Sequence, residues 1–145
     1  MALSDILLST YTDPPTRVFK TAWFRRAANK IEISDVTLCR RIRQAQRISI
    51  GNLGGGVVKI RLKNNLYRSI VLTDYGHLWI YVHLYAKQDS ANIKASELSD
   101  FRKLAILYQR SSATNINIAV SNGDLFEICH DEEANIQKQG VGSDS

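Results

Sequence analysis

The sequence predicts a single α+β domain, in which a small antiparallel or mixed sheet packs with two N-terminal helices and one C-terminal helix. Two segments before residue 50 carry helix caps and apolar stripes. Three consecutive segments between residues 57 and 86 then alternate with the period of a strand, and a longer helical segment follows them. With 145 residues, the chain is long enough for one domain with a core and too short for two.

The ends of the chain differ in composition from this domain. Asp13-Pro14-Pro15 fits neither a helix nor a central strand, so residues 1–16 are expected to form a flexible arm. The domain is expected to span residues 17–130, with a C-terminal extension from about residue 111. Residues 131–145 are polar and acidic and contain Gly and Ser, a composition typical of a disordered tail.

The first elements are a short strand at residues 17–21 and a helix at residues 23–30, for which Thr21 is a plausible N-cap. Trp23 is expected to make apolar contacts. Ser34 is a stronger N-cap, because Asp35 follows in the first turn, where a carboxylate complements the helix dipole. The apolar stripe of this second helix consists of Val36, Leu38, Cys39, Ile42, Ala45 and Ile48. Its arginines face outward, where they are solvated or contact phosphates or an acidic partner.

The glycines at positions 54–56 permit a sharp turn into a strand at residues 57–62. Val58, Ile60 and Leu62 share one face of this strand, and Val57, Lys59 and Arg61 share the other. Lys59 and Arg61 are therefore about 7 Å apart on one face of the strand. Two cations in this arrangement can bind a phosphate group. A solvated strand face without a task is the commoner explanation for such a pair.

The next strand, residues 66–73, follows a turn at residues 63–65 and is followed by a second turn at residues 74–76. Its alternation places Arg68 on the same side as Ile70 and Leu72. Arg68 is therefore expected either to curl to the edge of the sheet or to be half-buried and paired.

The clearest strand is predicted at residues 78–86. One face carries Leu78, Ile80, Val82 and Leu84, and the other carries Trp79, Tyr81, His83, Tyr85 and then Lys87. Aromatic rings, an imidazole and a lysine can stack on bases and contact phosphates. We expect the start of the strand to pack beneath the helices and His83 to Lys87 to be accessible.

The last predicted helix covers residues 97–109, with Ser96 as its cap. Its inward residues are expected to be Leu98, Phe101, Leu104, Ala105, Leu107 and Tyr108. After residue 111 two alternatives remain open. Residues 115–121 form a short helix closed by Gly123, with a strand at residues 125–130, or Asn122-Gly123 is the turn of a hairpin.

Charge is divided along the chain. Residues 17–63 contain twelve Lys and Arg and two acids, whereas residues 111–145 contain one Lys and six acids. A basic body suggests a polyanionic partner, although basic helices are often merely solvated. The three histidines are too scattered to predict a metal site, and no apolar run approaches the length of a membrane span, about 20 residues.

Cys39 and Cys129 are far apart in a sequence whose N-terminus does not read as a signal peptide. Both are therefore expected to be free thiols in a reducing cytoplasm.

Four short motifs follow one another along the chain. They are Phe19-Lys20-Thr21-Ala22-Trp23-Phe24, Asn52-Leu53-Gly54-Gly55-Gly56-Val57-Val58-Lys59-Ile60-Arg61, Tyr67-Arg68 and Tyr85-Ala86-Lys87-Gln88-Asp89. In these residues and in this order, the chain resembles the RelE/HigB-type toxins of bacterial type II toxin–antitoxin systems, from about Arg17 to Arg110. This resemblance implies a RelE-like fold.

The resemblance also implies a ribonuclease that cleaves messenger RNA, commonly at the ribosome, and thereby stops translation and growth. Its cognate antitoxin usually carries a DNA-binding domain. The RNA's own 2′-OH attacks the adjacent phosphate without a metal or another cofactor. The residues that would bind the phosphate are Lys59, Arg61, Lys63, Arg68 and Lys87. Arg61, Arg68, Lys87, Tyr85 and His83 would take part in catalysis, with the base and the acid unassigned. Asp89 is the acid found beside these cations in the sequence.

Two other functions remain open at this stage. ParE-type toxins, which share the fold, poison DNA gyrase, although converging cations favour a nuclease over a gyrase poison. A relative without catalytic activity could instead bind an antitoxin through the basic helix at residues 34–48.

Overall fold

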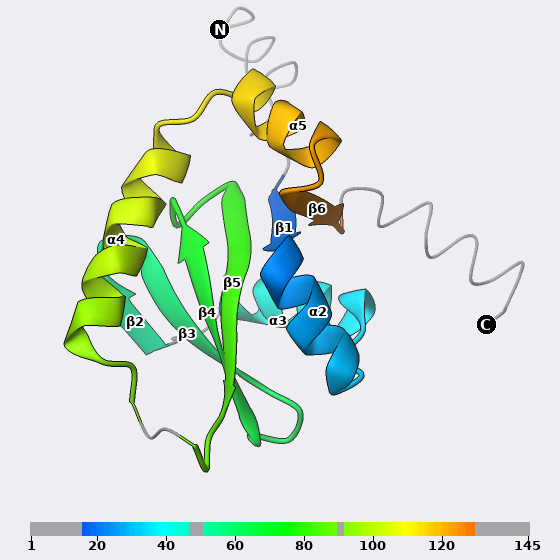
Figure 1. Cartoon of the computed structure of the whole chain (residues 1–145), viewed down its shortest axis with the longest axis vertical. Helices are drawn as coiled ribbons and strands as arrows, with labels where there is room; N and C mark the ends of the chain where they lie inside the picture. The colour runs from blue at the N-terminus through cyan, green and yellow to red at the C-terminus, as the bar shows by residue number, and fades with distance from the viewer. Residues whose placement is uncertain (1–15, 47–50, 90–91, 130–145) are drawn as a thin grey trace, which may run out of the picture.

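We describe a computed structural model of the chain, which defines residues 16–46, 51–89 and 92–129 (Figure 1). The predicted acidic tail, Ile48 and the N-terminal arm up to Pro15 lie outside these residues. The described elements, in chain order, are β1 (Arg17–Thr21), α2 (Ala22–Lys30), α3 (Asp35–Ala45), β2 (Gly51–Gly54), β3 (Val57–Leu62), β4 (Tyr67–Thr73), β5 (Leu78–Ala86), α4 (Ala95–Gln109), α5 (Ala113–Ser121) and β6 (Leu125–Ile128).

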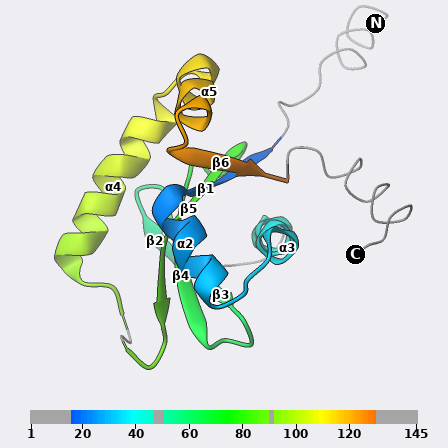
Figure 2. The same cartoon turned by 45° about the vertical axis from the view of Figure 1, so that its right-hand side comes forward.

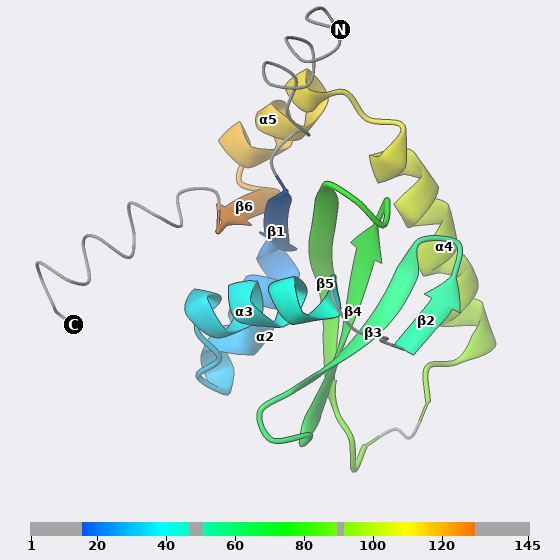
Figure 3. The same cartoon turned by 180° about the vertical axis from the view of Figure 1, so that it is seen from behind.

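The strands form one mixed sheet in the order β2-β3-β4-β5-β1-β6 (Figure 3). β1 runs parallel to β5, and the other neighbouring pairs are antiparallel. Helices cover both faces, as Figure 2 shows with α4 on one side of the strands and α3 on the other. α2 and α3 enclose one core with residues such as Phe24, Leu38 and Tyr81, and α4 and α5 enclose a second core with Phe19, Ile80 and Ala105. The predicted α+β class is confirmed.

Local chemistry explains where the N-terminal helices begin. Thr21 Oγ1 accepts a hydrogen bond from the Phe24 N–H at 3.1 Å, and Ser34 Oγ accepts one from the Thr37 N–H at 3.2 Å. Both predicted caps are therefore confirmed. The stripe of α3 is confirmed at Leu38, Cys39, Ile42 and Ala45, which are buried, and is wrong at Val36, which is 47% exposed.

The start of α4 differs from the prediction. The helix begins at Ala95, where the N–H of Lys94 donates to Glu97 Oε1 at 3.2 Å, so Ser96 lies inside the first turn and is not the cap. Leu107 is 65% exposed and not inward. The helix packs on the sheet through Leu98, Phe101, Leu104, Ala105 and Tyr108.

The glycine turn joins β2, a short strand that the sequence did not predict, to β3. Its glycines at positions 54–56 all have positive φ. A Cβ at Gly56 would lie 2.7 Å from the Thr73 carbonyl oxygen, so the chain requires glycine at this point. Arg102 of α4 donates to the carbonyls of Leu53 and Gly54. The turn is thereby held against α4, which fixes where β3 enters the sheet.

A bulge interrupts the alternation of β5. Ile70 of β4 lies opposite His83, whereas the next residue, Val71, lies opposite Tyr81. Val82 is thus the extra residue, and the side chains after it change face. Leu84 packs in the core beneath α2 and α3 with Tyr81, and Tyr85 packs with the core beneath α4. The predicted shared face of Trp79, Tyr81, His83 and Tyr85 is therefore wrong.

The C-terminal part resolves the open alternative. Residues 113–121 form α5, Gly123 follows it with a φ of 79°, and β6 pairs with β1. The helix followed by a strand is confirmed, and the hairpin is wrong.

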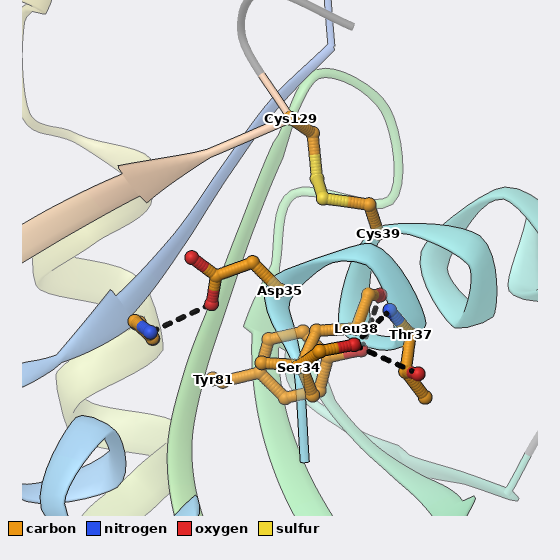
Figure 4. Close-up of a disulfide and its surroundings, with 8 residues drawn as sticks. Ser34, Asp35, Thr37, Leu38, Cys39, Tyr81 and Cys129 are labelled. Atoms are coloured by element: carbon orange, nitrogen blue, oxygen red, sulfur yellow. Dashed lines mark hydrogen bonds and ion pairs between the residues drawn. A yellow bond between two sulfur atoms is a disulfide. The ribbon is translucent and has the colours of Figure 1, made fainter. Parts of the chain in front are cut away.

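The expectation of free thiols is also wrong, because Cys39 and Cys129 form a disulfide (Figure 4). Cys39 lies in α3, and Cys129 directly follows β6. The antiparallel pairing of β6 with β1 brings residue 129 to the face that α3 covers, although 90 positions separate the two cysteines. Local sequence patterns do not reveal such a pairing, since it depends on strand order.

Candidate functional site

The register of β3, β4 and β5 places most of the candidate residues in two rows on one face of the sheet. Side chains directly opposite each other in an antiparallel pair share a face. Arg61, Arg68 and Tyr85 form the first row, with one residue from each strand. Lys59, Ile70 and His83 form the second row. The bulge in β5 is what brings His83 and Tyr85 onto the face of the cations.

Two arginines of the first row face each other across β3 and β4. Arg61 is exposed, whereas Arg68 is only 6% exposed. Arg68 Nη1 donates to the carbonyl oxygens of Asn65 at 2.9 Å and Tyr67 at 3.4 Å, which are uncharged acceptors. Arg68 therefore does not curl to the edge of the sheet. It is more deeply buried than the half-buried placement predicted, and its partners are backbone carbonyls. Like charges directly opposite in a sheet are unfavourable, and a bound anion would relieve this repulsion.

The nearby acids do not neutralise these cations. Among the residues that the structure describes, the salt bridges join Arg17 to Glu127 and Lys20 to Asp35. Neither bridge includes a residue of the two rows. The first row therefore presents a concentrated positive charge, as binding of a phosphate requires.

His83 lies half-buried among aromatic rings. Its ring centroid is 5.0 Å from that of Trp23, 5.9 Å from Tyr85 and 5.7 Å from Phe101. Burial lowers the pKa of the His83 imidazole below its ordinary value of 6.5, against a smaller opposing effect of Glu97. The imidazole is accordingly neutral at pH 7, the form that accepts a proton.

The Tyr85 hydroxyl is a polar group without a partner. Its oxygen is covered from solvent and has no hydrogen-bond partner in the described part of the chain. Desolvation raises the pKa of this phenol, Arg68 opposes that rise, and Glu97 adds to it. A buried hydroxyl left unsatisfied typically costs about 1–3 kcal/mol. The hydroxyl is thus an unused donor beside Arg68.

The substitution Tyr85→Phe tests this description. We expect the free energy of unfolding to stay unchanged or to rise by up to about 1 kcal/mol, because the change removes an unsatisfied hydroxyl. Urea denaturation followed by circular dichroism measures the effect. The matched control is Tyr81→Phe, because the buried Tyr81 hydroxyl donates to the Leu38 carbonyl at 2.8 Å. That control should lose about 1 kcal/mol, and an equal loss in both variants would contradict the assignment.

Two predicted phosphate-binding residues lie apart from the rows. The Lys63 ammonium donates to the Ile31 carbonyl at the end of α2, and the backbone of residues 63–65 is left-handed. Lys87 is exposed in the turn after β5, and its backbone N–H donates to the Leu66 carbonyl at 2.9 Å. Lys87 remains near the end of the strand that carries Tyr85.

The structure adds two residues that the sequence pattern did not indicate. Glu97, in the first turn of α4, lies close enough to influence the pKa values of both His83 and Tyr85. Trp23, expected in apolar contacts, is 44% exposed and stacks on His83. Both reach the site only because α2 and α4 pack against the sheet. An acid at the start of a helix predicted to cover the strands was the available signal for Glu97.

No group of His, Cys, Asp and Glu that could hold a metal ion occurs in the described residues. Within the same residues, no helix is long and apolar enough to cross a membrane.

One family model matches the chain over all of its described helices and strands. Residues 16–128 match a family model described as the RelE toxin of the RelE/RelB toxin–antitoxin system. A search of curated proteins finds no match. The matched region includes both rows and extends past Arg110 through α5 and β6.

Proposed function

The chain belongs to the family of RelE toxins of RelE/RelB toxin–antitoxin systems, which confirms the resemblance, and on this premise we propose that it is an endoribonuclease that cleaves messenger RNA at the ribosome. Its family makes an antitoxin its protein partner. We extend this to an antitoxin with a DNA-binding domain. Translation and growth stop when the antitoxin is absent.

The observation that carries the proposal is the first row. Arg61 and Arg68 lie opposite each other, one accessible and one held in place by backbone carbonyls, and no described carboxylate pairs with them. Fixed cations of this kind act on the charge that develops on a phosphate during its transfer. A gyrase poison does not need this convergence.

The reaction we propose is an internal transfer that needs no metal. The 2′-oxygen of the RNA forms a bond to the adjacent phosphorus, and the bond from phosphorus to the 5′-oxygen breaks. His83, neutral because of its lowered pKa, accepts the proton of the 2′-OH. Arg61, Arg68 and Lys59 stabilise the negative charge on the phosphate oxygens.

The leaving 5′-oxygen must gain a proton. Tyr85, whose hydroxyl has no partner within the described residues, and Lys87, at the end of the same strand, are the proposed donors. Whichever of them does not donate provides a contact to the base or to a second phosphate.

Induction of the chain in a bacterial host tests the function. We would map the 5′ ends of cellular RNA within minutes of induction, with Arg61→Ala in parallel and Arg40→Ala as a control for an exposed arginine of α3. New ends in translated messages that disappear only in Arg61→Ala support the proposal. Toxicity with intact messages and damaged DNA would instead identify a gyrase poison. Tight binding to an antitoxin without any toxicity would identify a non-catalytic relative.

The pH dependence of cleavage distinguishes the proposed base. Because burial lowers the pKa of the His83 imidazole below its ordinary value of 6.5, the midpoint of the acid limb of the rate should lie below pH 6.5. Initial rates on a purified RNA substrate between pH 4 and 9 measure this profile. Glu97 lies close enough to influence His83, so a substitution of each residue is needed to decide which of them gives the acid limb. Glu97→Gln should leave the acid limb in place, whereas His83→Gln should remove it.

A further inference from the structure

A cleft lies between α2 and the end of β5, next to the two rows. Its volume is about 490 Å³, within the range of small-ligand sites. The side chains that give it its chemistry are Trp23, Arg26, Lys30, Tyr67, Gln88 and Asp89. None of these residues belongs to the rows, so the proposed cleavage reaction does not use them.

The lining combines aromatic rings with cations. Trp23 is 44% exposed, and Tyr67 is half-buried at the start of β4. Arg26 and Lys30 are both exposed and, being four positions apart on α2, lie on one face of the helix. Aromatic platforms beside cations are how proteins bind single-stranded nucleic acid, with stacking for the base and charge for the phosphate. Asp89 is the one acid of this lining and can accept a hydrogen bond from an amino group of a base.

The cleft is continuous with the proposed cleavage site. Tyr85, the last residue of the first row, also lines the cleft. Trp23 stacks on His83 of the second row with a centroid distance of 5.0 Å. A strand of RNA whose scissile phosphate contacts Arg61 therefore meets the cleft as it continues past β5.

We propose that this cleft binds a nucleotide of single-stranded RNA that flanks the cleavage site, with its base against Trp23 and Tyr67 and its phosphate at Arg26 and Lys30. The inference rests on the proposed function and extends it to a second binding site. Because the cleft holds RNA through stacking and charge, it selects single strands over duplexes, in which the bases are already stacked.

Tryptophan fluorescence tests the proposal on the full chain. The chain has two tryptophans, and Trp79 is only 3% exposed, so quenching by a ligand reports mainly on Trp23. The probe is a short single-stranded 2′-O-methyl oligoribonucleotide, which cannot be cleaved because its 2′-oxygens are blocked. We expect saturable quenching, and we expect Arg26→Ala combined with Lys30→Ala to weaken binding about ten-fold. The control, Lys103→Ala with Arg110→Ala, removes the same charge from the region of α4 and should bind within two-fold of the wild type.

The outcomes separate this inference from the nuclease. Unchanged fluorescence, or equal binding by the Arg26/Lys30 variant and its control, overturns the proposal that the cleft binds RNA, even if the wild type cleaves RNA. Quenching that is lost in the variant supports the cleft even if no RNA is cleaved, in which case the proposed nuclease fails alone. Quenching by a poly-glutamate peptide but not by RNA assigns the cleft to an acidic protein segment and overturns the proposal.

Discussion

Replacing Arg61 with alanine is expected to reduce the rate of RNA cleavage about 100- to 1000-fold, the usual effect of removing one group that stabilises developing negative charge. Arg61 is the exposed arginine of the first row, so it is the one that an RNA phosphate reaches directly. Its loss also removes the repulsion with Arg68, which should leave stability unchanged or slightly higher. Single-turnover cleavage of a purified message, with and without ribosomes, measures the rate.

The structure supplies controls for this experiment. The backbone carbonyl of Arg61, and not its side chain, accepts the hydrogen bond from Arg41 at 3.0 Å, so Arg61→Ala retains this link between β3 and α3. Arg61→Lys keeps the charge but loses the bidentate geometry of a guanidinium, and should recover only part of the rate. Wild-type rates in Arg61→Ala, with an unchanged melting temperature, would show that the first row is not where the phosphate binds.

Loss of the disulfide should lower the free energy of unfolding by about 2–4 kcal/mol. The bond closes a loop of 90 positions, which restricts the unfolded chain strongly. For a domain of this size the melting temperature should fall by about 10 °C. Scanning calorimetry of Cys129→Ser against the oxidised wild type measures the change.

A reductant provides the matched control. Dithiothreitol should lower the melting temperature of the wild type to that of Cys129→Ser and leave Cys39→Ser unaffected. Equal melting temperatures for the wild type with and without reductant would contradict a stabilising bond. Disulfides persist in oxidising compartments, so the redox state of the compartment determines which of the two stabilities the protein has.

Most elements of this fold can be predicted from local patterns because local chemistry defines them. The caps at Thr21 and Ser34, the alternation of β3 and the turn at residues 63–65 each depend on residues a few positions apart. The same alternation correctly places Lys59 and Arg61 on one face. Arg68 lies on the same face because it is directly opposite Arg61 in the pairing of β3 with β4. The alternation of β4 predicts the same placement.

The errors arise where one residue or a distant partner decides the outcome. The alternation rule assigns every second residue of a strand to the same face. Because Val82 is an extra residue in β5, this rule predicts the wrong face for the side chains that follow it. Glu97 follows His83 by 14 positions and lies on a different element, and the packing of α4 over the sheet brings it to the site. The disulfide likewise follows from the pairing of β6 with β1, which no local pattern near either cysteine specifies.

The position of β1 in the sheet has a consequence for synthesis of the protein. β1 is made first but lies between β5 and β6, whose residues are added some sixty to one hundred positions later. A nascent chain that stops before residue 125 leaves one edge of β1 unpaired and lacks Cys129. At about 5–20 residues per second, many seconds separate translation of the first strand from completion of its pairing. The sheet therefore reaches its final strand order only after nearly all of the described chain has been synthesised.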